Sequence, residues 1–252
     1  MTPTLPLSPG FYALVGPNAA GKTHFLHSLI GPDAAFVPAG SDIHFAGRTV
    51  ADHLRAATTI RKLSSVSLPD KVQESSRFSD LSVGQRRLLT INLAFAVDAP
   101  LLLLDEPFDG LDVTSRRTAR ENLIAYLAEN TDRTIIMASH RTEDFAGLAT
   151  HVIQAFEHEI SEPMLIDDLR TSFPTVTGPI KDVNALAERY GELTRSTLGP
   201  TARVTLAEAP LDLDSMPGLS VEYPDDAQLL DILATTPAPA ATSEATTRKA
   251  QP

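Results

Sequence analysis

The sequence predicts an α/β protein built on a mostly parallel sheet with helices on both faces. Short apolar segments alternate along the chain with longer segments of helical period, which is typical of parallel βα units. One segment, Leu101–Leu104, is four consecutive leucines, as expected for a strand buried on both faces. A glycine-containing turn, Gly16–Thr23, separates the first apolar segment from the first helical one.

The first four elements follow from the spacing of apolar residues and from the glycines and prolines that end each segment. Phe11–Val15 is a short apolar run and predicts the first strand. A helix is expected over 22–30, because glycine and proline then occur together and end it. Ala34–Val37 predicts a second strand before a proline, and residues 49–63 have the period of a second helix.

The next elements continue the alternation. A longer helix is expected over 83–97, followed by the strand at Leu101–Leu104. A helix over 113–130 begins after Asp112, a good N-cap residue. Strands at 134–138 and 151–156 complete the predicted sheet.

Composition excludes several classes of protein. Hydrophobic residues make up 42% of the 252-residue chain and charged residues 21%, ordinary values for a globular protein. The absence of cysteine excludes disulfides, thiolate catalysis and cysteine-based metal sites, and it fits a reducing cytoplasm. No run of 18 apolar residues predicts a membrane span, and the N-terminal residues do not resemble a secretory signal.

The negative charge is unevenly distributed and suggests three parts. Residues 1–159 carry a net charge of −4, residues 160–234 carry −8, and residues 235–252 carry +1. A net charge of −11 disfavours nucleic acid as a partner, and we expect the basic cluster at Arg116, Arg117 and Arg120 to be a solvated helix face.

The predicted domains are a catalytic domain at 1–160, an acidic accessory domain at 161–234 and a disordered tail at 235–252. In the accessory domain, apolar residues between 180 and 193 have helical spacing, 202–206 and 219–223 look like strands, and 227–233 looks like a final helix. The tail contains mainly Ala, Thr and Pro, which bury too little surface to offset the entropy of ordering.

The turn after the first strand fits the phosphate-binding pattern G-x-x-x-x-G-K-[ST] in its strand–loop–helix context. Its glycines let backbone N–H groups point at a polyphosphate, and the Lys22 ammonium is expected to reach the β- and γ-phosphates. The Thr23 hydroxyl is expected to ligate Mg²⁺. The predicted loop consists of Gly16, Pro17, Asn18, Ala19, Ala20, Gly21, Lys22 and Thr23.

Two carboxylates follow the leucine strand. Parallel strands end at one edge of a sheet, so Asp105 is expected near the Mg²⁺ as a direct or water-mediated ligand. Glu106 points differently because successive side chains must, and it is a candidate general base that polarises an attacking water.

Together with these motifs, Leu81-Ser82-Val83-Gly84-Gln85 makes residues 5–160 resemble the ATP-binding cassette (ABC) ATPases. The segment is similar to the family signature L-S-G-G-Q, with valine at the first glycine. The resemblance implies that Ser82, Gly84 and Gln85 contact the γ-phosphate of an ATP held by the opposite subunit of a head-to-tail dimer.

Further segments match the family in order. Gly110-Leu111-Asp112 resembles the D-loop, which crosses the dimer interface, and His140 resembles the switch histidine that contacts the γ-phosphate and the attacking water. The resemblance implies an ATPase that uses ATP and Mg²⁺, with Glu106, His140 and Lys22 as catalytic residues. A helical subdomain is expected at about 48–87.

Three departures from the family are visible. Only 15 residues precede Gly16, so the aromatic residue that normally stacks on adenine is unassigned, and we expect Phe11 and Tyr12 to be core residues. Ala39 stands where the family has a glutamine, for which Asp42 is a possible replacement. The short spacing between Lys22 and Asp105 implies a trimmed helical subdomain.

The leading hypothesis is the ATP-binding subunit of an ABC transporter. It would act as a homodimer or heterodimer with a second ATPase subunit, on a separate polytopic membrane permease at the inner face of the cell membrane, and we favour export over import. One alternative is a soluble ABC ATPase of the DNA-repair or chromosome type. Another is a nucleotide-sensing module with little turnover. The transported substrate is not encoded in any recognisable motif.

Overall fold

The computed structural model describes residues 7–40, 43, 45–211, 213 and 216–237. Residue contacts divide the chain into two compact units, residues 1–166 and 167–252. Asp42 and almost all of the predicted disordered tail lie outside the described residues.

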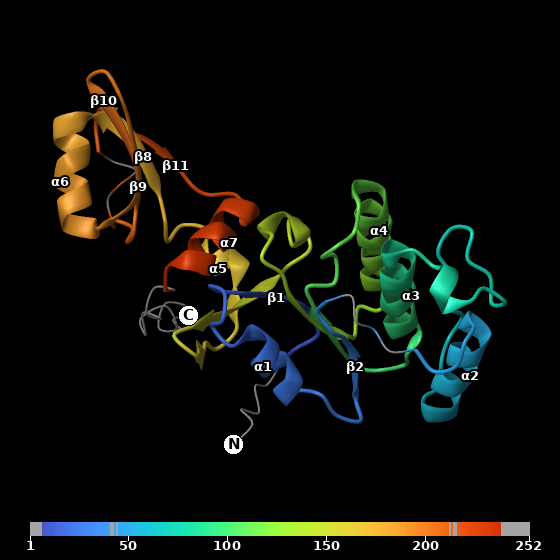
Figure 1. The fold of residues 1–252 in the computed structure, drawn as a ribbon. Coiled ribbons are helices and arrows are strands. Elements are labelled where there is room, and N and C mark those ends of the chain that lie inside the picture. Colours follow the sequence, from blue (N-terminus) through green and yellow to red (C-terminus); the bar gives the residue numbers. More distant parts are fainter. Residues whose placement is uncertain (1–6, 41–42, 44, 212, 214–215, 238–252) are drawn as a thin grey trace. The chain divides into compact units, whose positions relative to one another are not determined.

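The first unit is organised around one large sheet (Figure 1). Its strand order is β2-β3-β4-β1-β5-β6, and β7 also pairs with β5. Strands β1 to β5 pair in parallel, while β6 and β7 are antiparallel additions to β5. The strands are β1 (Gly10–Val15), β2 (Ala34–Val37), β3 (Leu101–Asp105), β4 (Thr134–Ala138), β5 (His151–Phe156), β6 (Glu159–Ile160) and β7 (Met164–Leu165). The predicted fold class is confirmed.

Both faces of this sheet are buried, as the continuous apolar runs predict. Successive side chains of a strand point to opposite faces of the sheet. All five residues of β4 are buried, so both faces are covered at this strand. One layer packs Phe25 and Leu26 of α1 (Lys22–Ser28) against Leu14 and Ile153. Phe11 and Tyr12 are each 1% exposed, which confirms that they are core residues.

Three further helices complete the first unit: α2 (Val50–Ile60), α3 (Val83–Ala96) and α4 (Val113–Glu129). Helix α2 begins with a capping box in which Thr49 Oγ1 accepts from Asp52 N at 3.2 Å and Thr49 N donates to Asp52 Oδ2 at 3.0 Å. It packs through Val50 on a small apolar cluster that includes Leu89 of α3. Most of this cluster lies within residues 48–87, the range predicted for a trimmed helical subdomain.

The second unit contains a four-stranded antiparallel sheet of order β11-β8-β10-β9, with α6 lying along one face (Figure 1). Val183 and Leu186 of α6 pack on Val204 and Leu206 of the sheet. The elements are α5 (Ile166–Leu169), β8 (Thr175–Pro179), α6 (Ile180–Tyr190), β9 (Glu192–Leu198), β10 (Thr201–Leu206), β11 (Ser220–Glu222) and α7 (Asp226–Thr235).

Some expected bounds were wrong. Helix α1 ends at Ser28, two residues early, and α2 ends at Ile60 because Arg61 adopts an extended conformation. In the second unit, the helical spacing was extended to Leu193, but α6 ends at Tyr190 because Gly191 has φ of +74°. Leu193 therefore lies in β9.

Candidate functional site

The phosphate-binding pattern lies between β1 and α1, and glycine is required at its first position. Gly16 has φ of +143°, and a Cβ there would lie 1.9 Å from the carbonyl oxygen of Ala155. Gly21 has φ of +101° and Ala19 has φ of +62°, so the backbone curls back on itself. The side chains of Pro17, Asn18, Ala19 and Thr23 are exposed, and that of Ala20 is buried.

Lys22 folds over this loop. Its Nζ donates to the carbonyl oxygens of Gly16 at 2.7 Å and Pro17 at 3.0 Å. Burial lowers the pKa of Lys22, while the nearby carboxylates of Glu106 and Asp105 raise it. The ammonium therefore lies within electrostatic reach of both carboxylates at the end of β3.

Asp105 ends β3 as a buried carboxylate. It is 2% exposed, and its Oδ2 atom is buried without a hydrogen-bond partner. A buried carboxylate oxygen without a donor is costly, so this atom is suited to a cation that the site would hold. The described residues contain no cluster of three or more His, Asp or Glu side chains arranged as a metal cage.

Glu106 and His140 are paired. Glu106 has a left-handed φ of +45°, and its Oε2 lies 2.8 Å from His140 Nδ1 and accepts from His140 N at 3.2 Å. The carboxylate side chain is 21% exposed and the imidazole 49%. The two predicted catalytic side chains thus lie together at the solvent-accessible edge of the sheet.

The loop that carries His140 is held by hydrogen bonds within the loop and from arginines of α4. Ser139 is buried and donates through Oγ to Asp144 Oδ2 at 2.8 Å, and Arg116 Nη1 donates to Asp144 Oδ1 at 2.9 Å. Arg120 donates to the carbonyl oxygens of Asp144 and Ala146. The prediction that the arginine cluster is solvated was therefore wrong for Arg116 and Arg120, because the loop after β4 covers them.

The signature segment forms the start of α3. Ser82 Oγ accepts from Gln85 N at 3.1 Å, and Ser82 N donates to Gln85 Oε1 at 2.9 Å, which makes a complete capping box. A Cβ on Gly84 would lie 3.3 Å from Ser115 Oγ of α4, so glycine permits close approach of the two helix starts. Val83, at the position of the first family glycine, is 51% exposed.

Asp112 is the N-cap of α4, as predicted. Its carboxylate accepts from Ser115 N at 2.9 Å and from Ser115 Oγ at 3.0 Å. These hydrogen bonds, led by that from the Ser115 backbone, lower the pKa of Asp112.

The predicted site residues form two clusters. The first contains Lys22, Asp105, Glu106 and His140. The second contains Ser82, Gly84, Gln85 and Asp112. Within the described part of the chain, no hydrogen bond or ion pair joins the second cluster to the first.

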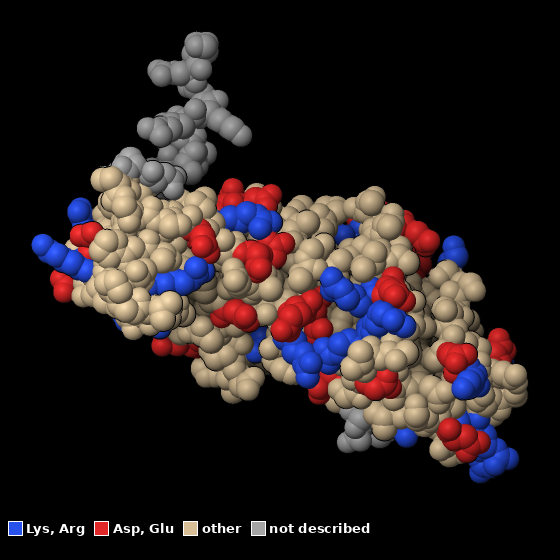
Figure 2. Space-filling view, turned by 90° about the horizontal axis from the view of Figure 1, so that it is seen from above, with Lys and Arg blue, Asp and Glu red and all other residues tan. Residues whose placement is uncertain are grey.

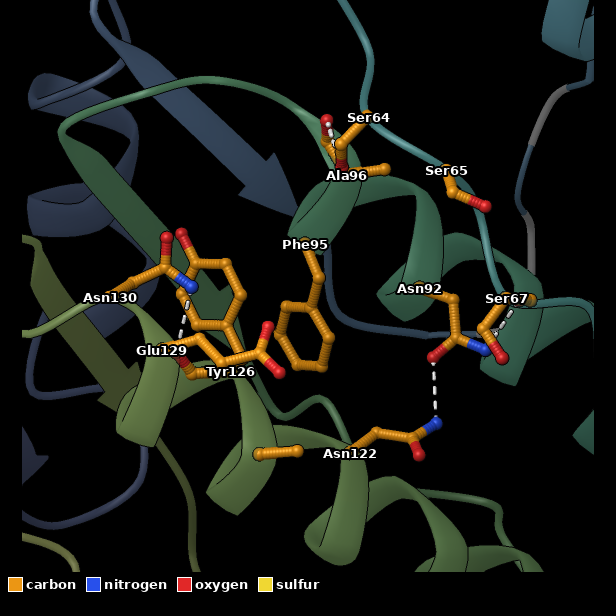
Figure 3. Close-up of a pocket in the computed structure, with 11 residues that line it drawn as sticks. Ser64, Ser65, Ser67, Asn92, Phe95, Ala96, Asn122, Tyr126, Glu129 and Asn130 are labelled. Carbon is orange, nitrogen blue, oxygen red and sulfur yellow. Dashed lines mark hydrogen bonds between the residues drawn. The ribbon is translucent and has the colours of Figure 1, made fainter.

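A pocket of about 420 Å³ lies between α3 and α4 and is lined largely by polar side chains (Figure 3). Asn122 Nδ2 donates to Asn92 Oδ1 at 2.9 Å, and Asn92 Nδ2 donates to the Ser67 carbonyl at 2.8 Å. Phe95 and Tyr126 stack with centroids 4.8 Å apart. None of the predicted site residues lines this pocket.

A groove of about 580 Å³ lies at the start of α4, where arginines from α4 and the loop after β4 alternate with acidic residues. Figure 2 shows the same mixing of basic and acidic side chains on one face of the molecule. This mixture lacks the single positive sign that a nucleic-acid backbone favours.

Arg87 was not predicted as a site residue. It is 3% exposed and donates to backbone carbonyls at the end of β3 and after β2. Arg87 lies four residues before the buried Ile91 and therefore on the apolar face of the predicted helix. A charged residue on that face is the feature of the sequence that could have indicated a special role.

Comparisons with known proteins agree with this geometry. A family model described as ABC transporter matches residues 35–109. An ABC transporter ATP-binding protein of Streptomyces coelicolor is 30% identical, over 81% of this chain and 39% of its own length. In sequence the chain is similar to ATP-binding cassette proteins. A solved ATP-binding subunit of an ABC transporter, 22% identical, covers 65% of this chain and 81% of its own, with a TM-score of 0.55, and shares the cassette fold.

Other relatives differ in the direction of transport that their names print. A Nod factor export ATP-binding protein of Cupriavidus metallidurans is 27% identical over 73% of this chain and 75% of its own length. A sulfate/thiosulfate import ATP-binding protein of Nocardia farcinica is 30% identical over 56% of this chain and 52% of its own length. The chain thus spans from about two fifths to three quarters of the length of these three curated relatives. Among the described residues, no helix is both long and apolar enough to cross a membrane.

Proposed function

We propose that this cassette binds and hydrolyses ATP and powers transport through separate membrane subunits. The observation that carries the proposal is the cluster of Lys22, Asp105, Glu106 and His140 beside a curled phosphate-binding loop. These groups provide a cation for phosphate, a carboxylate for a metal ion and a paired base, which are the parts that phosphoryl transfer to water requires.

ATP would be held by the loop. Backbone N–H groups of the curled segment would donate to phosphate oxygens, and Lys22 would exchange its contacts to Gly16 and Pro17 for the β- and γ-phosphates.

Mg²⁺ fits the residues present. Thr23 Oγ1 and Asp105 Oδ2 would hold it, and the buried, unpartnered Oδ2 atom supports this assignment. The ion would neutralise charge on the phosphate oxygens.

Glu106 would act as the general base. Its carboxylate would accept a proton from water while the water oxygen bonds to the γ-phosphorus and the bond to the bridging oxygen of ADP breaks. The backbone N–H of His140 would hold the base in place, and the imidazole N–H, now 2.8 Å from this carboxylate, would turn to donate to the γ-phosphate. ADP and inorganic phosphate are the products.

A second cassette would complete each site. Gly84 and the backbone beside Ser82 and Gln85 lie at the start of α3, where they would meet the γ-phosphate bound by the opposite subunit, and Asp112 would lie at the same interface. Exposed Val83 and Val113, 51% and 88% exposed, flank this surface and support a partner there. The partner would be identical or a related cassette.

The proposed place of action is the cytoplasmic face of the cell membrane, on a polytopic permease. We favour export, because the export relative aligns over 73% of this chain and the sulfate/thiosulfate import relative over 56%. The proposed division is a catalytic domain at 1–160 with a helical subdomain at 48–87, an accessory domain at 161–234 and a tail at 235–252.

The deciding experiment is Glu106→Gln, with Glu129→Gln at an exposed position of helix α4 as the control. We expect ATP turnover to fall about 100-fold or more because the base is lost, with ATP still bound. Size-exclusion chromatography should then show an ATP-dependent dimer that the wild type forms only transiently. Unchanged turnover and no dimer would instead favour a nucleotide-sensing module, and salt-sensitive DNA binding would favour the DNA-repair type.

A further inference from the structure

The guanidinium of Arg87 is fully occupied by backbone carbonyl oxygens from two separate segments. Arg87 lies in α3, and all five of its N–H donors have a partner. Its Nε donates to Pro107 (2.8 Å), Nη1 to Pro38 (2.5 Å) and Gly40 (3.2 Å), and Nη2 to Asp105 (3.1 Å) and Glu106 (2.6 Å).

Such an arrangement is specific to arginine. Burial lowers the pKa of Arg87, and the carboxylates of Asp109, Asp105 and Glu106 counteract this. A lysine at the same place has three donors on one nitrogen and cannot span two segments in a planar fork. The site is therefore built to hold two pieces of backbone at a fixed separation.

One of the two segments is the turn that carries the proposed base. Glu106 has a left-handed φ of +45°, a conformation that is unfavourable for a residue other than glycine and persists only when its surroundings hold it. The hydrogen bond from Arg87 to the Glu106 carbonyl and that from Glu106 N to Ala138 O at 2.9 Å hold both sides of this residue.

The other segment is the loop after β2. Arg87 Nη1 binds the carbonyls on both sides of Ala39, whose own side chain is a single methyl group. Arg87 thus links the backbone on both sides of Ala39 to the backbone carbonyls at the end of β3 and in the turn that follows it. A displacement of this loop must either break these hydrogen bonds or move the guanidinium, which also binds Glu106.

We propose that Arg87 is a positioning residue that couples the loop after β2 to the backbone of Glu106. It keeps Glu106 in its left-handed conformation, and it transmits movement of the loop to the base. The inference rests on the proposed function only for the role of Glu106 in hydrolysis. The mechanical link itself is independent of ATP.

The first test compares Arg87→Lys with Arg61→Lys. Arg61 is a matched control, because its guanidinium also binds two backbone carbonyls, those of Gly31 and Ala34, and it has no contact with Glu106. We expect Arg87→Lys to lower kcat about 100-fold through misplacement of the base, while the Kd for ATP changes less than about threefold. Arg61→Lys should leave both constants near wild type. Parallel loss of kcat and ATP affinity in Arg87→Lys, or an unchanged kcat, would overturn the proposal.

The second test does not depend on turnover. Hydrogen exchange of the Glu106 amide, measured by NMR on the nucleotide-free full chain, reports local opening of this turn. Gly40 has φ of +83° with open space around its Cα, so Gly40→Ala strains the loop without a clash. We expect Gly40→Ala to raise the Glu106 exchange rate about tenfold when Arg87 is present and much less in Arg87→Lys, a non-additive pair in a double-mutant cycle.

Additive effects of the two substitutions would exclude coupling through Arg87. If the wild type turns over no ATP, the proposed function fails while the exchange experiment still decides the coupling. If the wild type is active and exchange effects are additive, only the inference about Arg87 fails.

Discussion

At the carboxyl edge of the large sheet one buried carboxylate oxygen has no hydrogen-bond partner, whereas charged side chains of the second unit form ion pairs on its surface. At the edge, Asp105 Oδ2 is buried with no donor and Glu106 keeps a left-handed backbone. In the second unit, Arg203 donates to Glu222 at 2.8 Å and Arg195 to Glu192 at 2.8 Å. The contrast indicates that the first unit keeps a buried carboxylate oxygen unpartnered at the place where a ligand would bind.

The largest effect that tests this contrast is expected for Asp105→Asn. A neutral amide removes the cost of a buried charge, so the nucleotide-free protein should become more stable by about 1 kcal/mol or more. The increase in Tm that ATP with Mg²⁺ gives the wild type should disappear, and turnover should fall about 100-fold or more.

Thermal unfolding without and with ATP and Mg²⁺ measures the stability of the nucleotide-free protein and the increase in Tm that the ligand gives. Asp132→Asn, on an exposed loop where the carboxylate side chain is 82% exposed, is the control and should leave both quantities unchanged. A loss of stability in nucleotide-free Asp105→Asn would contradict the view that this carboxylate is kept for a ligand.

The five parallel strands of the first unit could be predicted because they are apolar runs, whereas β6 and β7 were not predicted. The predicted bounds of β2, β4 and β5 agree with the structure, since each run is closed by residues that a buried strand does not tolerate. The phosphate-binding loop was predictable for a different reason, as its pattern prescribes a backbone shape.

Strand β8 (Thr175–Pro179) could not be predicted, because it contains glycine and proline and alternates threonine with small side chains. It is stabilised by pairing with β10 and β11, which lie later in the sequence. The contact of Glu106 with His140, and the one of Arg87 with the turn after β3, also depend on segments that are 19 or more residues apart. Residue pattern alone does not specify such side-chain partners.

A smaller effect is expected when the N-terminal cap of a helix is removed, and it should differ between the two units. Ser82 and Asp225 each form a capping box, with Gln85 and Gln228 respectively. Ser82→Ala and Asp225→Ala should each cost about 1 kcal/mol of stability through the lost cap. Only Ser82→Ala should also weaken ATP-dependent dimerisation, because only this cap lies at the proposed interface.

Analytical ultracentrifugation in the Glu106→Gln background, where the dimer accumulates, measures the second property. Equal weakening of the dimer by both substitutions would show that the effect comes from reduced stability, and the assignment of the signature cluster to the interface would then be wrong.

The smallest effect is expected for the ion pair between Arg203 and Glu222 in the second unit. The two side chains are 48% and 56% exposed, and solvent screens such pairs while their flexible side chains lose entropy. Arg203→Ala, Glu222→Ala and the double variant should all unfold within about 2 °C of the wild type, and turnover should not change. A clear non-additive loss of Tm would mean that the surface charges of the second unit are structurally coupled after all, and a change in turnover would give this unit a part in the ATPase cycle.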